Sequence, residues 1–260
     1  MRTLTIDGVN LLTTYGVWIA GDDVYNGATA DVETVKVPGR NGDLIYSNKR
    51  YNNFSLSYRC AIPTDGANKI ALLRAFLFSN IGYRKIVDSY HSGMYRMGRI
   101  TGAMNPSGIG WNANALLFTI TFDCKPQHFY DSGDVETEIT TSGTSISNAT
   151  LFDSLPIVRI YLPSTDPGTG HNIIATFANS GRIYNTRIDK TIYTDQAASA
   201  RTFIDLDCEI KEASHYDNQN GIINMNKYII GAFPVLHPGS TTVTFTYIDK
   251  IVVKPRWWTL

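Results

Sequence analysis

Cysteine is scarce in this sequence. The 260 residues include three cysteines, Cys60, Cys124 and Cys208, which lie far apart and form no Cys-x-x-Cys pair. An odd, sparse set of this kind argues against a disulfide framework or a zinc site, and it suits thiols kept in a reducing compartment. The sequence therefore predicts no structural disulfide, no metal site and no other cofactor.

An excess of charge of either sign is also missing. Lysine and arginine together number 23, and so do aspartate and glutamate, which makes the formal net charge zero. A protein that binds nucleic acid or an anionic membrane through its overall field carries a basic excess. We therefore expect no sequence-specific nucleic-acid partner, no membrane partner and no preference for acidic substrates.

Long apolar runs are absent as well. No stretch approaches the roughly 18 apolar residues that a transmembrane helix needs. The first eight residues lack the continuous apolar core and the small-residue cleavage site of a signal peptide. We expect a soluble protein that is made in the cytosol.

Alternating strand patterns dominate what is present. Hydrophobic residues make up 43% of the chain, which suffices for one large β domain or two domains of about 130 residues. Near the end of the chain, Thr241, Val243, Phe245 and Tyr247 share one face of a predicted strand, and a second strand at 251–253 follows a short turn. The two tryptophans beyond it are unusual for a free terminus, so we expect them to dock on the first half of the chain or on a neighbouring subunit.

The first half reads as sheet with one helix. A strand at 32–37 runs into the turn 38–43, whose glycines suit positive φ angles. Alternation returns at 51–61 and 116–122, and a hairpin is expected at 84–101. The helix is predicted at about 66–80, with Leu72 and Phe78 adding a second apolar side that we expect to be buried.

A composition shift marks the domain boundary. Residues 131–155 are rich in serine, threonine and glycine, and short, helix-free strands follow them. We therefore predict a mainly β protein, with a first domain at 1–130 and an antiparallel β-sandwich at 131–248.

Candidate catalytic residues are few. Asp205, Asp207 and Glu209 alternate along one strand, which fits a calcium or acid–base cluster, but also a solvated sheet face. The histidines lack metal-ligand spacing and are interpreted as surface or loop residues: His91, His128, His171, His215 and His237. No nucleophile elbow or phosphate loop is present. We predict no catalytic site and no enzyme activity.

Two further patterns concern sugars. Asn148-Ala-Thr150 matches a glycosylation sequon, which carries no meaning without secretion. Exposed aromatic residues such as Trp18, Trp111, Tyr193 and Tyr216 could stack on sugar rings, and of these Tyr193 and Tyr216 are the candidate glycan contacts. The alternative function is therefore a carbohydrate-binding module that contacts host cell-wall saccharide.

Several separate stretches, among them Val37–Leu44, Phe122–Gln127, Leu155–Ile160 and Pro255–Trp258, together resemble the distal tail proteins of siphophages and prophages of Gram-positive bacteria. The turn Val37-Pro-Gly-Arg-Asn-Gly-Asp-Leu44 is similar to the family's Pro-Gly-Arg-Asp-Gly turn, with Asn41 at the fourth position. The order and spacing of the matches extend across nearly the whole chain. The residues that carry the resemblance are Pro38, Gly39, Arg40, Gly42, Cys124, Lys125, Pro126, Pro234, Pro238, Gly239, Pro255, Arg256, Trp257 and Trp258.

The resemblance implies a structural virion protein. Its first domain would assemble into a homo-hexameric ring at the tip of a long non-contractile tail, its second would be a galectin-like sandwich, and the last strand, at about 249–260, would return to the ring domain. The ring would join the major tail tube protein to the tail-associated hub protein and to receptor-binding or baseplate proteins. The protein would then be located in the virion, after assembly in the cytoplasm of the bacterial host.

Overall fold

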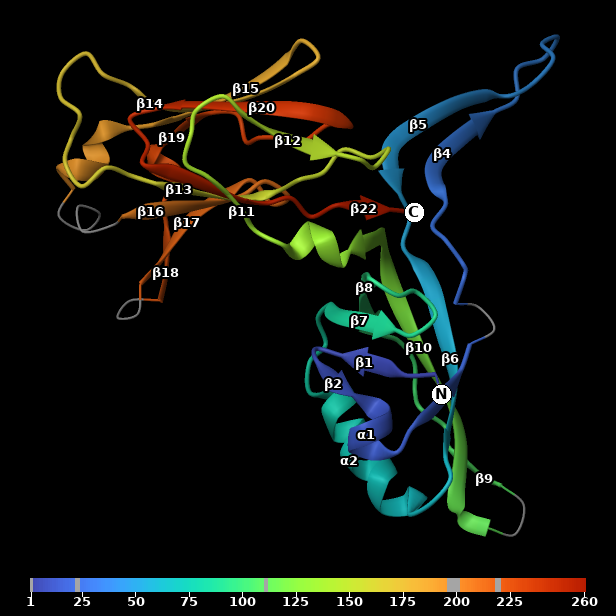
Figure 1. Cartoon of the computed structure of the whole chain (residues 1–260). Helices are drawn as coiled ribbons and strands as arrows, with labels where there is room; N and C mark the ends of the chain where they lie inside the picture. Colours follow the sequence, from blue (N-terminus) through green and yellow to red (C-terminus); the bar gives the residue numbers. More distant parts are fainter. Residues whose placement is uncertain (1, 22–23, 110–111, 196–201, 218–220) are drawn as a thin grey trace. The chain divides into compact units, whose positions relative to one another are not determined.

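The computed structural model describes residues 2–21, 24–109, 112–195, 202–217 and 221–260. The chain divides into two compact units, one formed by residues 1–129 with Leu260 and the other by residues 130–259. Neither α-helix among the described residues has the length and apolarity needed to span a bilayer. Figure 1 shows the sheets that make up each unit.

The first unit is built on an antiparallel sheet. Its strands follow the order β2-β1-β7-β8-β10-β6-β3, and β9 pairs with β10. The pairing of β6 with β10 runs without interruption from Phe54↔Cys124 to Ile62↔Leu116. The strands are β1 (Leu4–Ile6), β2 (Val9–Asn10), β3 (Trp18–Ala20), β6 (Phe54–Ile62), β7 (Arg84–Asp88), β8 (Met94–Ile100), β9 (Ser107–Ile109) and β10 (Asn112–Tyr130).

Two helices lie beside this sheet (Figure 1). The helix α2 (Gly66–Phe78) confirms the predicted helix, and it buries Leu73 and Leu77 completely. Its supposed second apolar side is not buried, because Leu72 is 63% and Phe78 46% exposed. The short helix α1 (Leu11–Tyr15) was not predicted. The Asn10 side chain caps it by accepting from two backbone N–H groups.

The core of the first unit contains a buried polar pair. Tyr58 and Phe122 are fully buried and their rings meet edge to face at 6.1 Å. The Tyr58 hydroxyl donates to Asp88 at 2.6 Å, and burial raises the pKa of Tyr58. Because the Tyr58 hydroxyl is hydrogen-bonded to Asp88, burial of these two polar groups leaves neither of them unpaired.

The strands β4 (Ala30–Val35) and β5 (Leu44–Tyr51) form a separate two-stranded sheet, which we call the arm. The arm projects beyond the rest of the sheet of its unit, and β5 leads directly into β6 (Figure 1). A register shift between Ala30 and Val32, with Lys49 at φ 55°, marks a bulge at its base. We predicted β4 and the turn, but the strand at 44–51 was missed.

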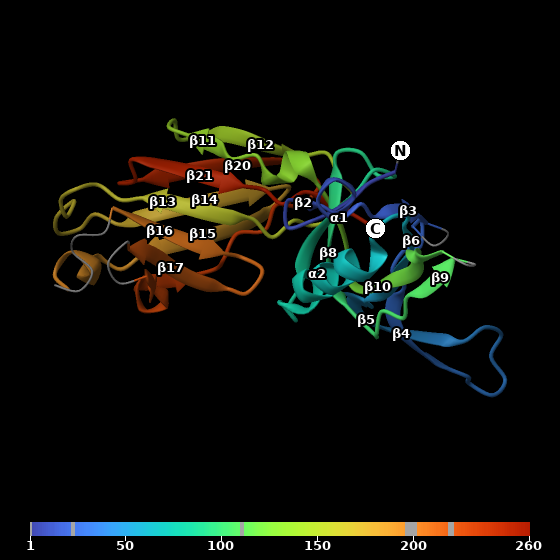
Figure 2. The ribbon, with the colours of Figure 1, turned by 90° about the horizontal axis from the view of Figure 1, so that it is seen from below.

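The second unit is an antiparallel β-sandwich, as predicted. One sheet has the order β11-β21-β13-β16-β17-β18 and the other the order β12-β20-β14-β15-β19; Figure 2 shows their strands overlying one another. The strands are β11 (Thr137–Ile139), β12 (Thr144–Asn148), β13 (Ile157–Tyr161), β14 (Ile173–Asn179), β15 (Arg182–Ile188), β16 (Phe203–Asp207), β17 (Glu212–Asp217), β18 (Gly221–Asn224), β19 (Ile229–Gly231), β20 (Gly239–Thr246) and β21 (Lys250–Lys254).

Alternating residues from both sheets fill the sandwich. Val158 and Leu206 point inward from the first sheet, Phe177 and Val243 from the second, and all four are fully buried. Short 3-10 helices connect some of the strands: η1 (Asp131–Asp134), η2 (Lys190–Tyr193) and η3 (Asn226–Tyr228). This inward alternation is the period-two signal that the sequence carries.

The last residues of the chain divide between two sheets. The strand β21 of this segment pairs with β11 and β13 of the sandwich and buries Ile251 and Val253 there. The short strand β22 (Trp258–Thr259) follows and pairs with β10, a strand of the sheet of the first unit. Trp258 stacks on Phe152 of the second unit, with their ring centroids 4.4 Å apart.

Candidate functional site: the arm and the surfaces of the sandwich

Both faces of the arm carry exposed apolar side chains. Val35 and Tyr46 lie on one face and are 46% and 58% exposed, and Val32 and Ile45 lie on the other at 42% and 64%. A ribbon that packs on its own core would turn one polar face outward. An isolated two-stranded hairpin is also only marginally stable in water. The arm thus has the composition of a surface that is covered in an assembly.

The tip of the arm is the turn that carries part of the family resemblance. The Arg40 N–H donates to the Val37 carbonyl at 3.2 Å, with Pro38 and Gly39 between them. Gly39 has φ 80° and Gly42 φ 82°, which confirms the expectation of positive φ angles at these glycines. Proline at the second position and a positive φ at the third are the features of a type II turn. The turn is exposed and presents Arg40 to solvent.

An ion pair crosses the base of the arm. Arg50 donates to Asp31 at 2.6 Å, and this hydrogen bond lowers the pKa of the Asp31 carboxyl. The Asn52 N–H also donates to the Thr29 carbonyl at 2.8 Å. These contacts fix the direction in which the arm leaves its unit, while its two faces stay open.

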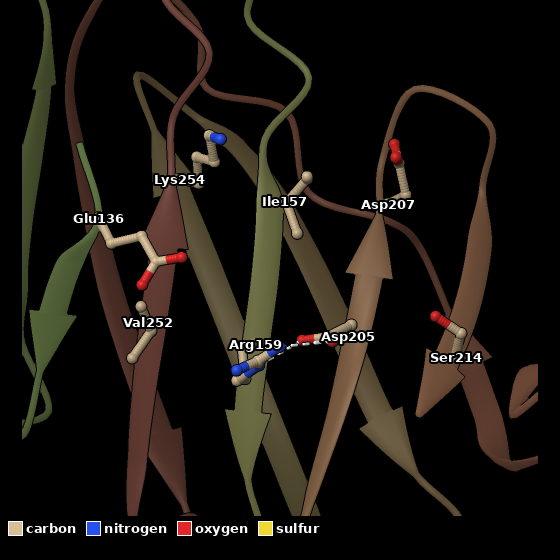
Figure 3. A pocket seen from close by; sticks show the side chains of 8 residues that line it. All are labelled: Glu136, Ile157, Arg159, Asp205, Asp207, Ser214, Val252 and Lys254. Atoms are coloured by element: carbon tan, nitrogen blue, oxygen red, sulfur yellow. Dashed lines mark hydrogen bonds and ion pairs between the residues drawn. The ribbon is translucent and has the colours of Figure 1, made fainter. Parts of the chain in front are cut away.

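Asp205, Asp207 and Glu209, which we call the acidic row, form ion pairs with two arginines. The row lies on the outer face of the first sheet of the second unit, where a hollow of about 340 Å³ opens among charged residues (Figure 3). Arg159 reaches across to Asp205 with two hydrogen bonds of 2.6 and 2.8 Å, which raise the pKa of Arg159. The hollow is lined by Glu136, Ile157, Arg159, Asp205, Asp207, Ser214, Val252 and Lys254.

Arg256 holds the other two acids of the row. It donates twice to Asp207 at 2.9 Å and once to Glu209 at 3.5 Å. Partial burial raises the pKa of Asp207, but the hydrogen bonds and charge of Arg256 outweigh it and lower the pKa overall. Within the described ranges no group of three or more histidine, cysteine or acidic side chains could hold a metal ion. Each carboxylate of the row is therefore hydrogen-bonded to Arg159 or Arg256.

Three of the five histidines are buried. The prediction of surface or loop positions is wrong for His128 in β10 and His215 in β17, whereas His237 lies in a loop but is only 6% exposed. Burial lowers the pKa of His128 to about 3, which keeps it neutral. His237 contacts Asp153 at 2.6 Å and the Tyr184 hydroxyl at 2.8 Å. Sequence spacing could not reveal this cluster, because its members come from segments far apart in the chain.

Most motif residues of the second unit meet around the segment 148–154. The Leu236 N–H, between Pro234 and Pro238, exchanges backbone hydrogen bonds with Ser154. Pro234 is buried, whereas Pro238 and Gly239 are exposed, and Gly239 has φ 92°.

The C-terminal motif meets the same segment. The Ser154 hydroxyl bonds to the carbonyls of Pro255 and Arg256, and the Trp258 indole donates to the Asp153 carbonyl at 2.9 Å. Pro255 is buried, and Trp257 packs against the sandwich core.

The remaining motif residues lie in β10. Cys124 is fully buried and faces the core of the first unit, and burial raises the pKa of its thiol to about 12. Lys125 lies over the Tyr83 ring at 5.4 Å, and Pro126 is half-buried.

The two tyrosines considered as glycan contacts have different environments. Tyr193 packs against the sandwich core and its hydroxyl donates to the Pro163 carbonyl at 3.0 Å. Tyr216, on β17, is 58% exposed. Trp18 is 46% exposed, and Trp111 lies outside the described residues. Tyr193 is thus held mainly by the fold, whereas Tyr216 is open to solvent.

The sequence matches no protein-family model, and no curated protein matches it. A solved structure does match: the crystal structure of the Dit protein (gp 19.1) of phage SPP1, described as a paradigm of the hub adsorption apparatus in phages that infect Gram-positive bacteria. The TM-score is 0.68, the identity is 15%, and the match covers 97% of this chain and 98% of that chain. The chain therefore has the fold of SPP1 Dit along nearly its whole length, which confirms at the level of fold the resemblance to distal tail proteins.

Proposed function

We propose that this protein is a structural component of the tail tip of a phage with a long non-contractile tail, and that it performs no reaction. The observation that carries the proposal is the match in fold to SPP1 Dit over nearly the full length of both chains. Because the match covers both units, it supports one structural role for the whole chain and not for one unit alone. The ion-paired acidic row gives no support to an enzymatic alternative.

We further propose that six copies close a ring and that the arm reaches onto a neighbouring copy. The apolar side chains on its two faces are exposed, and the described part of the same unit does not bury them. A second copy could bury them. In a ring, each copy offers one surface to the next and receives the same contact from the copy before it. One arm per copy then meets one acceptor surface per copy, and no arm stays uncovered.

The ring would join the major tail tube protein to the tail-associated hub protein and would carry receptor-binding or baseplate proteins. DNA would pass through its lumen without being read. The zero net charge is consistent with such a conduit, because a strongly basic wall would retain the phosphate backbone. The protein would act in the virion, after assembly in the cytoplasm of the host.

The test is the mass of the purified full-length chain, measured by size-exclusion chromatography with light scattering and by negative-stain images. A ring predicts a particle near six times 28.9 kDa with sixfold views. A particle that stays a single copy at high concentration and in the presence of its tail neighbours would refute the ring.

The role of the arm needs its own variant. Replacing Ile45 and Tyr46 with aspartate places a charge on each face of the arm, and we expect the ring to dissociate into single copies. The matched control is Ile81→Asp, because Ile81 is 91% exposed in the same unit but lies outside the arm; this change should leave the mass unaltered. A ring that persists in the arm variant would refute the contact through the arm and leave the ring itself to the first measurement.

A further inference from the structure

The second unit contains an uncharged hollow that the proposed assembly does not use. Its volume is about 400 Å³, at the lower end of the range for small-molecule pockets. None of the lining residues carries a charge, whereas the hollow beside the acidic row is lined by several charged side chains. The lining residues of the uncharged hollow are Tyr130, Ser132, Ser147, Ala149, Thr150 and Trp257.

Two aromatic side chains form part of the wall. The Tyr130 N–H donates to the Trp257 carbonyl at 2.9 Å, so the backbones of the two residues are fixed to each other. Trp257 also packs against the sandwich core. Within the described ranges, the Trp257 indole N–H and the Tyr130 hydroxyl have no hydrogen-bond partner in the protein. Each ring thus combines an apolar face with an unused polar group.

Hydroxyl groups line the rest of the hollow. Ser132 and Ser147 are exposed, and no described residue accepts from or donates to their side-chain oxygens. The Thr150 hydroxyl donates to Asn148 at 2.7 Å and accepts from the Phe152 N–H at 3.4 Å, so one lone pair of its oxygen remains available as an acceptor. A hydroxyl both donates and accepts, and it therefore matches other hydroxyls in either direction.

The lining is held rigidly before any ligand arrives. Gly133 lies so close to the C-terminal segment that a Cβ there would come within 2.3 Å of the Trp257 nitrogen. The Arg256 N–H donates to the Gly133 carbonyl at 2.8 Å. The buried Asn148 side chain, next to the lining residues Ala149 and Thr150, is held by hydrogen bonds to Phe152 and Leu236. A preformed site binds without the entropic cost of ordering its walls.

We propose that this hollow binds one ring of a neutral saccharide. A charged ligand would lose water without gaining a countercharge, because the lining is uncharged. A purely apolar ligand would leave the indole N–H and the hydroxyls of Tyr130 and the serines unpaired. A sugar ring presents C–H groups to an aromatic face and hydroxyls at its edge, and it satisfies both parts of the lining.

The inference goes beyond the proposed structural function and does not depend on the ring. It also moves the sugar contact away from Tyr193 and Tyr216 to a site that combines two aromatic rings with three hydroxyls. Free sugars and sugars within a cell-wall polymer share this chemistry, and a comparison of mono- and oligosaccharides distinguishes the two sources.

The test is saturation-transfer-difference NMR on the full-length chain with glucose, galactose, rhamnose, N-acetylglucosamine and β-linked oligomers of glucose and N-acetylglucosamine. Affinity for the probes that bind is then measured by titration. Trp257→Ala removes the main aromatic face, and we expect it to weaken binding at least tenfold. Ser147→Lys fills the hollow from an exposed strand position without touching the core, and it should have the same effect even if the tryptophan variant folds poorly.

The matched control is Thr244→Lys. Thr244 is exposed on β20, four residues beyond Ser240, the cross-strand partner of Ser147, and therefore about 14 Å away along the same sheet. We expect this control, and Tyr216→Ala, to keep the wild-type affinity within twofold. The proposal is overturned if none of the sugars binds the wild type, or if Ser147→Lys binds them as well as the wild type does. It is also overturned if an aromatic peptide binds in the hollow and the sugars do not. The mass of the particle is measured separately, so failure here leaves the ring proposal intact.

Discussion

The buried amide of Asn148 offers a sharp test of how the second unit is held together. Asn148 is 3% exposed, and its side chain donates to the carbonyls of Phe152 and Leu236, both at 2.9 Å. Its oxygen accepts from the N–H and the hydroxyl of Thr150. All four hydrogen-bonding positions of the amide are therefore filled. This residue joins the segment 148–154 to the segment that contains Leu236.

Asn148→Asp keeps the shape of the side chain but replaces the two donated hydrogens with an oxygen. Each of the two carbonyls then loses one of its two hydrogen bonds, because the Ser154 N–H still donates to Leu236 and the Thr150 hydroxyl to Phe152. At about 0.5 to 1.5 kcal/mol for each lost bond, we expect the free energy of unfolding to fall by roughly 1 to 3 kcal/mol at pH 7. The introduced carboxylate also faces two carbonyl oxygens in a buried site, which raises its pKa in the folded state.

The raised pKa gives the variant a distinctive pH dependence. A group whose pKa is higher in the folded state than in the unfolded state stabilises the fold at a pH below its unfolded pKa, which is about 3.9 for aspartate. This stabilisation is lost as the pH rises through the folded-state pKa. The protonated carboxyl can donate one of the two lost hydrogen bonds. We therefore expect the difference from the wild type to shrink by about half near pH 4.

The assay is urea denaturation followed by tryptophan fluorescence, because Trp258 stacks on Phe152 within the affected region. Thr150→Ala is the control: it also destroys the sequon, but it keeps both donors of Asn148 and should destabilise by only about 1 kcal/mol. If Asn148→Asp unfolds within 1 kcal/mol of the wild type at pH 7, the reasoning is refuted.

Two further predictions concern titratable groups. Asp207→Asn should lower the free energy of unfolding by about 1 to 3 kcal/mol at pH 7, because it removes the charge that Arg256 binds. Since the pKa of Asp207 is lowered in the folded state, this difference should begin to shrink as the pH falls below the unfolded value of about 4, and it should disappear only below the lowered folded value; a difference that is constant from pH 7 to pH 3 would contradict the ion pair. All three cysteines are buried and burial raises the pKa of each thiol, so Ellman's reagent should react quickly only after denaturation, and fast labelling of the native chain would contradict their burial.

The predictable parts of the fold are those that depend on local pattern. The alternation in β6 and β10 and the helical spacing of Leu73 and Leu77 both predicted elements that the structure contains. The pattern failed where burial is decided by distant segments. Leu72 looks like a second core position but faces solvent, because the helix α2 packs through one side only.

The candidate sites were harder to predict for the same reason. A histidine reads as a surface residue until Asp153 and Tyr184 are known to surround His237. The acidic row reads as a solvated face because nothing in the local sequence places Arg256 beside Asp207, nearly 50 residues earlier. Trp257 carries the resemblance to distal tail proteins, but the sequence does not show that Tyr130 faces the same hollow.

The arm and the uncharged hollow make separate demands on the chain. The arm exposes apolar side chains on both faces of a thin ribbon, so a neighbour must supply the missing core, and the benefit grows with the number of copies that meet. The hollow is complete within one copy, since all its lining residues belong to the second unit. If both proposals hold, a ring would present six identical weak sites, and their combined avidity for a polymer with repeated sugars would exceed that of one site by several orders of magnitude. A single copy of the Ile45/Tyr46 aspartate variant should then bind a monosaccharide as tightly as the wild type, but should lose its hold on the polymer. That outcome would connect assembly to adhesion; equal loss of both would mean that the arm variant has damaged the second unit.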